Sequence, residues 1–546
     1  MVFGVGSSYL PVSDLALSEM LVRDVGRHPL YEGLYSRDDW SHPGPLLYIL
    51  LAPFYWLTGG SSIGLGLGTL AINGASVVGM GIVARRRAGT AAMVATFLAV
   101  GLLLRTLGAD IWGDAWNLHV TIVPFALLGF LVWALLDGDL WVLPVAVFVT
   151  SFLAQTHVGF LPLAVPLLGV GVAGVALAAW RSDDPDRWRR LVRPTAVATA
   201  VGGVLWLPPL IDIVDGPPRN LGNIVRWFRD AEGGVATVGD GLKVVSGPFG
   251  VPPEWATVRQ PFGTFGESHY LEDPVVPWLL LAVAVAGVVL WRRRPTGRPL
   301  LVVLVTMLAL GVAAVARTVG PQFEYRLLWT WVPPVVAFVV VALAGWTWLA
   351  ESHRSAARWV GAAAVACVAV LALVNGVAGV RAGTFDEGNS DVMAAITPPV
   401  VEAVEDVDEP VLVTDPFQAG AWYARGLVLQ LERRGIEAVV PPERRWEQSP
   451  HRIHDGGPVG ATLVVVTDRS VADYLEDPDL ELIVEWSDAS PEELDALDAA
   501  MDRIEADRVA GRIDDERASL LAGDLVAPLQ AATDATFYRV AVFRTR

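Results

Sequence analysis

The distribution of charge along the chain constrains its fold more than any other feature. Charged residues make up 18% of the 546 residues, against about 25% in typical soluble proteins. They are sparse from about residue 44 to 380 and dense from about 381 to the end. Apolar stretches close to the length that crosses a bilayer, about 20 residues, recur through the sparse part. The sequence therefore predicts an α-helical polytopic membrane protein with a C-terminal α/β domain.

We predict a transmembrane domain of about ten spans at residues 62–380. The spans are expected at about 62–83, 90–107, 117–136, 139–157, 160–180, 194–213, 275–291, 299–316, 328–350 and 358–380. If the first of these runs inward, the Arg-rich loops share the cytoplasmic side, as the positive-inside rule requires. The loops at 1–61, 108–116, 158–159, 214–274 and 317–327 then share the outer face with the C-terminal domain.

The segment 45–57 is apolar but too short to cross a bilayer at about 1.5 Å per residue. We predict an interfacial helix with Tyr48, Tyr55 and Trp56 at the level of the lipid headgroups. Counting it as a span would place the cluster Arg85–Arg87 outside. The first residues form no signal peptide, so either the first span delivers the 1–61 loop outside or an upstream helix is missing. We favour a missing helix.

The last part of the chain, 381–546, alternates buried strands with helical stretches. Strands are expected at 410–417, 436–441, 461–468, 480–486 and 537–545, and a charged helix at 490–520. No GxGxxG or Walker-type loop is present, so a scaffold or acceptor-recognition role is favoured over independent catalysis. The 214–274 loop holds an amphipathic stretch around Ile224, Trp227 and Phe228, which is typical of either a membrane-surface helix or an ordinary packing helix.

Composition excludes several classes of function. The formal net charge of −18 argues against a nucleic-acid partner, because phosphate neutralisation needs clustered Lys and Arg. The single cysteine, Cys367, lies in an apolar segment and rules out a disulfide or a thiolate metal site within one chain.

The stretch from Ser13 to Pro45 is unusually rich in ionisable groups for a segment beside membrane spans. A carboxylate at the membrane surface is suited to deprotonate an acceptor hydroxyl. Asp14 heads a helix-like stretch and is the candidate catalytic base, with helix capping as the alternative role. Glu19 is a candidate substrate-binding residue, with a solvated or arginine-paired side chain as the alternative.

The second acidic cluster in this stretch is Asp38-Asp39, followed by His42. Adjacent carboxylates and a histidine are a candidate set for a divalent cation, Mg²⁺ or Mn²⁺, although the sequence leaves metal dependence open. Asp39 is a candidate substrate-binding residue. His42 stands directly before a proline turn and is a candidate catalytic residue.

Further polar residues are expected at the outer ends of the spans. Asn117, His119 and His157 are candidates to shape a sugar pocket, with interhelical hydrogen bonding as the alternative. Arg326 begins a span on the outer side and is a candidate ligand for a lipid phosphate, with headgroup anchoring as the ordinary alternative.

These features resemble the GT-C superfamily of polyprenyl-phosphate-sugar-dependent glycosyltransferases. The resemblance covers about residues 13–210 and rests on an acid in the first outer loop followed by an HPP-like helix start, here His42-Pro43-Gly44-Pro45, where the family has HPPL. In detail the chain resembles large GT-C-like membrane proteins of actinobacteria. The resemblance implies that the first-loop acid, which maps best to Asp14, is the catalytic base.

The sequence thus predicts a glycosyltransferase of the plasma membrane. It would move a sugar from a polyprenyl-phosphate donor to a glycan, lipid or protein acceptor of the cell envelope. A non-catalytic envelope scaffold on the same frame is the alternative. A transporter or flippase is less favoured, because transporters place ionisable residues near the membrane midplane and the interiors of these spans hold few.

Overall fold

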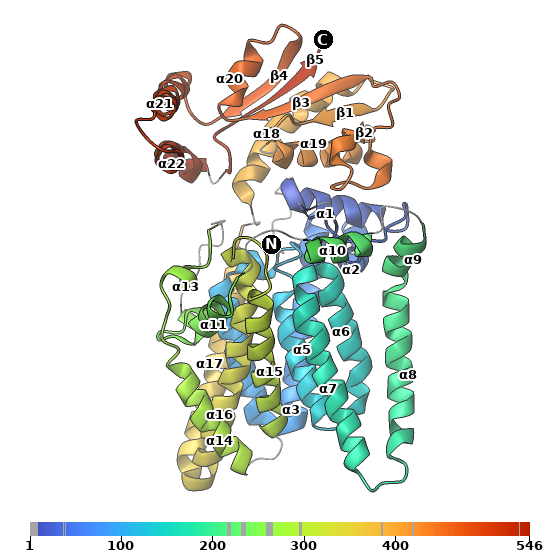
Figure 1. Ribbon diagram of the computed structural model, residues 1–546, viewed down its shortest axis with the longest axis vertical. Helices are drawn as coiled ribbons and strands as arrows, with labels where there is room; N and C mark the ends of the chain where they lie inside the picture. The colour runs from blue at the N-terminus through green and yellow to red at the C-terminus, as the bar shows by residue number, and fades with distance from the viewer. Residues whose placement is uncertain are drawn as a thin grey trace. The chain divides into compact units, whose positions relative to one another are not determined.

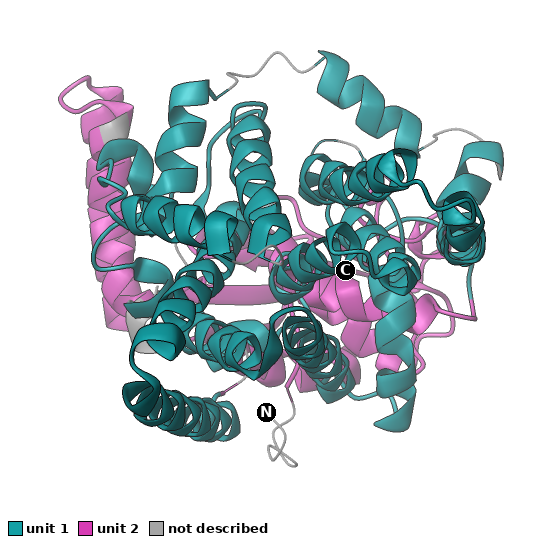
Figure 2. Ribbon diagram, turned by 90° about the horizontal axis from the view of Figure 1, so that it is seen from below, with its two compact units in different colours: residues 1–3, 28–382 teal, residues 4–27, 383–546 magenta. Residues whose placement is uncertain are grey.

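The computed structural model describes residues 9–36, 38, 40–215, 220–230, 236–257, 266–293, 297–383, 386–417, 420–533 and 535–546. The chain divides into two compact units (Figures 1 and 2). Unit 1 comprises Met1–Phe3 and His28–Ala382, and unit 2 comprises Gly4–Arg27 and Gly383–Arg546. The sequence prediction kept residues 1–61 together as one loop, whereas the structure divides this stretch after Arg27.

Unit 1 is helical in its described residues, and its long helices lie side by side (Figure 1). Its α-helices are α2 (Leu46–Leu57), α3 (Ile63–Leu107), α4 (Ala109–Trp112), α5 (Ile122–Leu136), α6 (Leu143–Thr156), α7 (Leu161–Arg181), α8 (Arg187–Leu205), α9 (Leu207–Asp215), α10 (Asn220–Asp230), α11 (Val238–Ser246), α12 (Glu254–Thr257), α13 (His269–Glu272), α14 (Leu279–Arg293), α15 (Gly297–Val315), α16 (Val332–Ser352) and α17 (Arg354–Arg381). Short 3-10 helices are η1 (Leu140–Val142), η2 (Val158–Phe160), η3 (Gly247–Phe249) and η4 (Glu324–Trp331).

Among the described residues, five helices are long and apolar enough to cross a membrane, or six if the bent pair α8 and α9 forms one span. Three further apolar helices are shorter: Leu46–Leu57, Ile122–Leu136 and Leu140–Thr156. The stretch labelled α3 covers two of the predicted spans and is two helices that meet at a kink, where Gly89 adopts a φ of 82° that a residue with a Cβ rarely adopts. The protein is therefore a multi-pass membrane protein.

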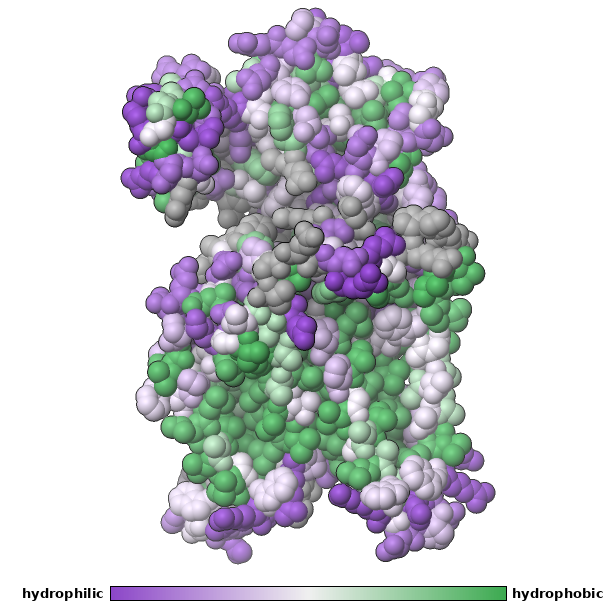
Figure 3. All heavy atoms as spheres, viewed as in Figure 1, coloured by the Kyte–Doolittle hydropathy of each residue, from purple (hydrophilic) through white to green (hydrophobic). Residues whose placement is uncertain are grey.

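The burial of the helices follows their composition. α5 is apolar on every face and buried along almost its whole length, as expected of a helix at the centre of a bundle. α17 is equally apolar, yet the apolar window that qualifies it as a span has no buried residue. Figure 3 shows apolar side chains over most of the middle of unit 1 on the face in view. Such a surface is suited to lipid and not to water.

The arginine-rich turns meet acidic partners at one end of the bundle. Arg87 approaches Asp137 and Asp139, each at 3.3 Å, and Arg293 pairs with Glu351 at 2.7 Å. The opposite end carries the loops that hold the polar candidates of unit 1.

The helix at 45–57 differs from its prediction in one respect. α2 forms over Leu46–Leu57, but Tyr48 and Tyr55 are buried in the protein and only Trp56 is exposed, at 54%. Gly68 explains this burial, because a Cβ there would lie 2.6 Å from the Leu51 side chain. The glycine lets α3 approach α2 closely, and both tyrosines pack inside the protein.

Unit 2 is a five-stranded α/β unit. Its strands are β1 (Val411–Thr414), β2 (Ala438–Val439), β3 (Ala461–Thr467), β4 (Leu480–Ser487) and β5 (Arg539–Thr545), in the order β2-β1-β3-β5-β4. β1 is parallel to β2 and β3, and β5 is antiparallel to β3 and β4. The helices are α1 (Ser13–Asp24), α18 (Glu387–Val404), α19 (Ala421–Arg433), α20 (Ser470–Leu475), α21 (Pro491–Val509) and α22 (Asp515–Thr533), with 3-10 turns η5 (Pro442–Arg444) and η6 (Pro450–Arg452).

The single charged helix predicted at 490–520 is wrong. The structure has α21 and α22, separated by a turn in which Gly511 adopts a φ of 67°. A glycine in the left-handed region just beyond the last helical turn is a common helix stop. α21 begins at a capping box in which the Ser490 hydroxyl accepts from the Glu493 N–H.

Helix α1 belongs to unit 2 because its acids meet arginines of that unit. The buried Glu19 accepts a hydrogen bond from Arg433 Nε at 2.9 Å. The Arg452 guanidinium binds both oxygens of Asp24, at 2.7 and 2.9 Å. A buried ion pair of this bidentate kind is costly to desolvate and costlier to break, so these contacts specify where α1 docks.

We predict that Arg452→Met destabilises the docking of α1 by about 3–5 kcal/mol, because it leaves Asp24 buried without its counter-charge. Native-state hydrogen exchange of the α1 amides in the full-length protein measures this change. Arg469→Met is the matched control, because the Arg469 side chain is 48% exposed in its pair with Asp502 and a surface pair contributes about 0–1 kcal/mol. Equal effects of the two substitutions would refute the prediction.

Candidate functional site

A short backbone ladder positions His42 at the loop end of unit 1. The Gly33 N–H donates to the His42 carbonyl at 2.8 Å, and the His42 N–H donates to the Leu34 carbonyl at 2.7 Å. Pro45, which lacks an N–H, then precedes α2, which begins at Leu46. The candidate histidine is therefore held by main-chain bonds on both of its backbone groups.

Gly44 seats this ladder against α6. Its N–H donates to the Gln155 carbonyl at 3.3 Å. A Cβ at position 44 would lie 2.3 Å from Gln155 Oε1 and 2.7 Å from its Cδ. A proline at this position, as in HPPL, would carry such a Cβ, so the contact with Gln155 accounts for the departure from the family pattern.

His42 meets His157 at the junction of α6 and η2. The ring centroids are 4.4 Å apart. His42 Nδ1 accepts the N–H of Val158 at 3.2 Å, and His157 Nδ1 accepts the N–H of Gly159 at 3.1 Å. Among the described residues, no hydrogen-bond partner occupies Nε2 of either ring. Two side chains predicted from separate parts of the sequence thus form one pair.

Arg326 supplies positive charge beside this pair. Burial, and after it the positive charge of Arg326, lower the pKa of His42 to about 3. Burial also lowers the pKa of His157 well below its usual value, with His42 and then Arg326 as additional causes. Both rings are therefore neutral at physiological pH. In the part of the chain that the structure describes, no carboxylate pairs with Arg326, whose Nη1 reaches only the Pro321 carbonyl at 3.5 Å.

The first residue of α10 ties the His42 ladder to the outer loop. Asn220 Oδ1 accepts the Ser41 N–H at 2.7 Å, and its Nδ2 donates to the Ser41 carbonyl at 2.9 Å. The Asn220 N–H in turn donates to Asp212 at 3.0 Å. Trp40 is 7% exposed and packs against Trp227 of α10. α10 is thus a packing helix in its inner part, although Phe228 is 48% exposed.

Glu32 is an acid beside the ladder whose importance the sequence did not reveal. Burial raises its pKa to about 7, with the nearby Asp212 as the next cause, while a hydrogen bond with Ser41 lowers it. A carboxyl group that titrates near neutral pH is suited to accept a proton. The sequence offered no signal for this, because Glu32 is one of several acids in its loop and Asp212 is about 180 positions away.

Asn117 and His119 extend the same site. Asn117 Nδ2 donates to the Thr156 carbonyl at 3.3 Å, immediately before His157. His119 Nδ1 lies 2.6 Å from Asp114, and its ring meets Trp116 edge-on at 4.8 Å. Trp116 also approaches Tyr325 at 5.4 Å, next to Arg326 in sequence. The structure therefore brings together Asn117, His119, His157, His42 and Arg326.

Two of the remaining candidates, Asp14 and Glu19, lie in unit 2. Asp14 lies in α1 of unit 2, where Arg425 Nη1 approaches its carboxylate at 3.3 Å. Glu19 is fully buried in the same helix and paired with Arg433. Asp39 lies outside the described residues. The catalytic role of Asp14 stays a prediction.

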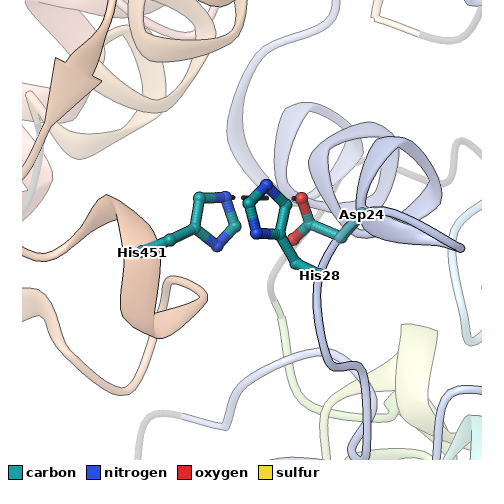
Figure 4. A group of neighbouring side chains, drawn as sticks. All are labelled: Asp24, His28 and His451. Atoms are coloured by element: carbon teal, nitrogen blue, oxygen red, sulfur yellow. Dashed lines mark ion pairs between the residues drawn. The ribbon is translucent and has the colours of Figure 1, made fainter.

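Cation ligands are few among the described residues of this site. Asp38 is exposed and bonds Ser36 Oγ at 3.3 Å. In unit 2, Asp24 faces His451 at 3.5 Å (Figure 4). Both oxygens of Asp24 already bind Arg452, and a cation placed there would be repelled by that guanidinium. Dependence on Mg²⁺ or Mn²⁺ stays a prediction.

A second polar cluster holds Glu324, two residues before Arg326. His269 Nε2 lies 3.1 Å from Glu254, and its Nδ1 lies 3.2 Å from Glu324. The hydrogen bonds with Glu254 and Glu324 raise the pKa of His269 to about 10. The two acids lie on opposite edges of the ring, so they hold an imidazolium and do not converge on a metal. The Glu324 N–H also donates to the Gly266 carbonyl at 3.1 Å.

Comparison with known proteins identifies the fold. No protein-family model and no curated protein matches the sequence. The crystal structure of ArnT from Cupriavidus metallidurans bound to undecaprenyl phosphate matches with a TM-score of 0.51 and 14% identity, over 87% of this chain and 92% of ArnT. The apo state of the same protein gives 0.51 and 14%, over 88% and 93%. The chain has a GT-C-like fold, as the sequence predicted, and the resemblance to actinobacterial proteins stays a prediction.

We predict that Gly44→Ala lowers the stability of the protein by about 1–3 kcal/mol, the usual cost of overpacking. The added methyl group must displace Gln155. The measurement is the free energy of unfolding in a double-mutant cycle with Gln155→Ala. Because the substitution at 155 removes the clash, Gly44→Ala should cost much less in that background. Additive effects would show that the two residues do not compete for space.

We predict that His269→Gln destabilises unit 1 in a pH-dependent manner. The folded pKa of about 10 lies above the ordinary value near 6.5, so the stabilisation is complete below about pH 6.5 and is lost as the pH rises through about 10. The difference in Tm between wild type and variant should therefore be larger at about pH 6 than at about pH 10. His353→Gln, at an exposed position, is the control. A difference independent of pH would contradict the ion-pair role.

Proposed function

We propose that this protein is a membrane glycosyltransferase that moves a sugar from a polyprenyl-phosphate donor to a cell-envelope acceptor. The GT-C-like fold, shared with a protein crystallised with undecaprenyl phosphate, supports this class of reaction. The single observation that carries the proposal is Arg326, a half-buried arginine that no described carboxylate pairs with, near two neutral histidines, His42 and His157. An arginine without an acidic partner is suited to bind an anion.

The position of Arg326 suits the phosphate of a lipid carrier. It lies in η4 at the start of the apolar stretch Glu324–Ser352, a candidate membrane span. A phosphate bound there would sit at the membrane surface with its polyprenyl chain among the apolar helices. We place this end of unit 1 at the outer face, because the arginine-rich turns lie at the other end. α17 ends beside α4 at this end, since a Cβ at Gly379 would lie 2.7 Å from Trp112.

Glu32 is our candidate for the catalytic base. In the transfer, the acceptor oxygen forms a bond to the anomeric carbon of the sugar, and the bond from that carbon to the phosphate oxygen breaks. The electron pair of the broken bond leaves with the polyprenyl phosphate, and the acceptor proton passes to the carboxylate. The pKa of Glu32, raised to about 7, matches a base that works near neutral pH. The carboxylate of Asp14 is already bound to Arg425.

We predict that transfer in proteoliposomes, assayed with a panel of polyprenyl-phosphate sugars, falls at least about a hundredfold in Glu32→Gln, the range attributed to general bases. Asp14→Asn is the competing variant, and under our assignment it retains most of the activity. Arg326→Ala should weaken the binding of the lipid phosphate. The rate in wild type should rise with pH through about 7, as Glu32 loses its proton, and this limb should be missing from the residual activity of Glu32→Gln.

Three outcomes distinguish the alternatives. Loss of transfer in Asp14→Asn and not in Glu32→Gln would return the base to Asp14. Normal transfer in Arg326→Ala would refute the phosphate role. An absence of transfer with every donor would reject the enzyme and favour a non-catalytic envelope scaffold.

A further inference from the structure

The buried His42 and the partly buried His157 share one arrangement of their ring nitrogens. In both rings Nδ1 faces a main-chain N–H, that of Val158 at 3.2 Å for His42 and that of Gly159 at 3.1 Å for His157. These two N–H groups are consecutive along the chain. Since a main-chain N–H can only donate, both Nδ1 atoms must be acceptors. The turn after α6 therefore sets the same tautomer on both rings.

A neutral imidazole with an accepting Nδ1 carries its proton on Nε2. Both rings thus present an Nε2–H donor on the edge opposite the main chain. No described residue accepts from either donor, although His42 is only 6% exposed. Since neither donor has a partner among the described side chains, both are open to a ligand that carries acceptor atoms.

The other polar groups nearby indicate the chemistry of that partner. Trp40, 5.6 Å from His42 between ring centroids, has a buried indole N–H without an acceptor among the described residues. Arg326 contributes a positive charge that acts on both histidines. All of these groups are donors, and none accepts. A ligand that matches them offers only acceptor atoms and carries negative charge, as a phosphate does.

We propose that His42 and His157 bind the phosphate of the lipid carrier as neutral hydrogen-bond donors through Nε2–H, while Arg326 supplies the charge. This inference rests on the proposed function and deepens it. The histidines neither take nor give a proton in the reaction. Their role follows from the charge of the ligand, which is −1 in the sugar phosphodiester and approaches −2 as the polyprenyl phosphate leaves. Donor hydrogen bonds to that oxygen strengthen as its charge grows, and so favour the transition state.

Asparagine and glutamine test this role because each can replace one ring nitrogen of histidine and not the other. In His42→Asn the amide oxygen can take the place of Nδ1 and accept from Val158, while the Nε2 donor is lost. In His42→Gln the amide nitrogen reaches the Nε2 position as a donor, while the bond to Val158 is lost. The same pair of substitutions applies to His157 and Gly159. His353→Asn, at the exposed start of α17, is the control for the loss of any histidine.

The measurement is the binding of undecaprenyl phosphate to the purified full-length protein in nanodiscs, with thermal unfolding as a check on folding. We expect each Asn variant to bind about tenfold to a hundredfold more weakly, the effect of one hydrogen bond to a charged group. We expect each Gln variant to bind within about threefold of wild type. Because neither histidine titrates in the reaction, the rate of transfer should depend on pH in the same way in wild type and in the Gln variants.

The results separate this inference from the proposed function. Gln variants that bind as weakly as Asn variants would reduce both histidines to structural residues. Asn variants that bind like wild type would also overturn the donor role. A wild-type protein that binds no undecaprenyl phosphate would overturn the inference whatever its transfer activity. Binding that follows the expected order without transfer from any donor would sustain the inference and refute the glycosyltransferase.

Discussion

The candidate site depends on the seating of the His42 ladder on the turn between α6 and η2. Main-chain groups make this contact from both sides: the Gly44 N–H meets the Gln155 carbonyl, and the Val158 N–H meets His42 Nδ1. Because the contact uses backbone groups, it fixes the ring of His42 in both position and tautomer. The missing Cβ of Gly44 is the steric condition for this approach. Three other features depend on this close approach: the pairing of His42 with His157, the effect of Arg326 on both rings, and the hydrogen bonds to Asn220.

The pKa values at this site depend on burial more than on pairing with opposite charges. Burial is the first cause of the depressed pKa of both histidines and of the raised pKa of Glu32. In each case the low-dielectric surroundings disfavour the charged form. The ladder therefore carries His42 as a neutral hydrogen-bond donor. Glu32, ten positions earlier in the sequence, is an acid that titrates near neutral pH. A site in which Arg326 is the charged group keeps the whole of that charge available to an anion.

Sequence reasoning found the part of this site that lies at helix ends. Asn117, His157 and Arg326 stand at the ends of long apolar stretches, and the ends of neighbouring antiparallel helices meet at one side of a bundle. His42 was found because it precedes a proline turn. These predictions needed only apolar length and the alternation of sides, which the sequence displays openly. The GT-C-like fold followed from the same pattern together with the first-loop motif.

The docking of α1 was beyond such reasoning. A short helix with an acidic, half-apolar pattern looks the same whether it packs on a membrane bundle or on a soluble unit. Its partners Arg433 and Arg452 stand more than 400 positions away, and no local signal joins them to Glu19 and Asp24. Glu32 escaped notice for a related reason, since its raised pKa arises from burial and from Asp212 and not from its neighbours in sequence. Tertiary environment decided both.

Neutral donors have a physical advantage over further cations in a site of this kind. A group that binds substrate and transition state equally well lowers KM without raising the rate of the chemical step. A lysine in place of His42 would attract the phosphodiester of the donor strongly before any bond breaks, and would retain the dianionic product still more strongly afterwards. An imidazole N–H carries no net charge, so its attraction to the ground state is smaller and grows mainly with the charge that develops on the leaving oxygen. In the site that we propose, one arginine would capture the phosphate and two neutral rings would stabilise the leaving oxygen, so that binding and catalysis would rest on different groups.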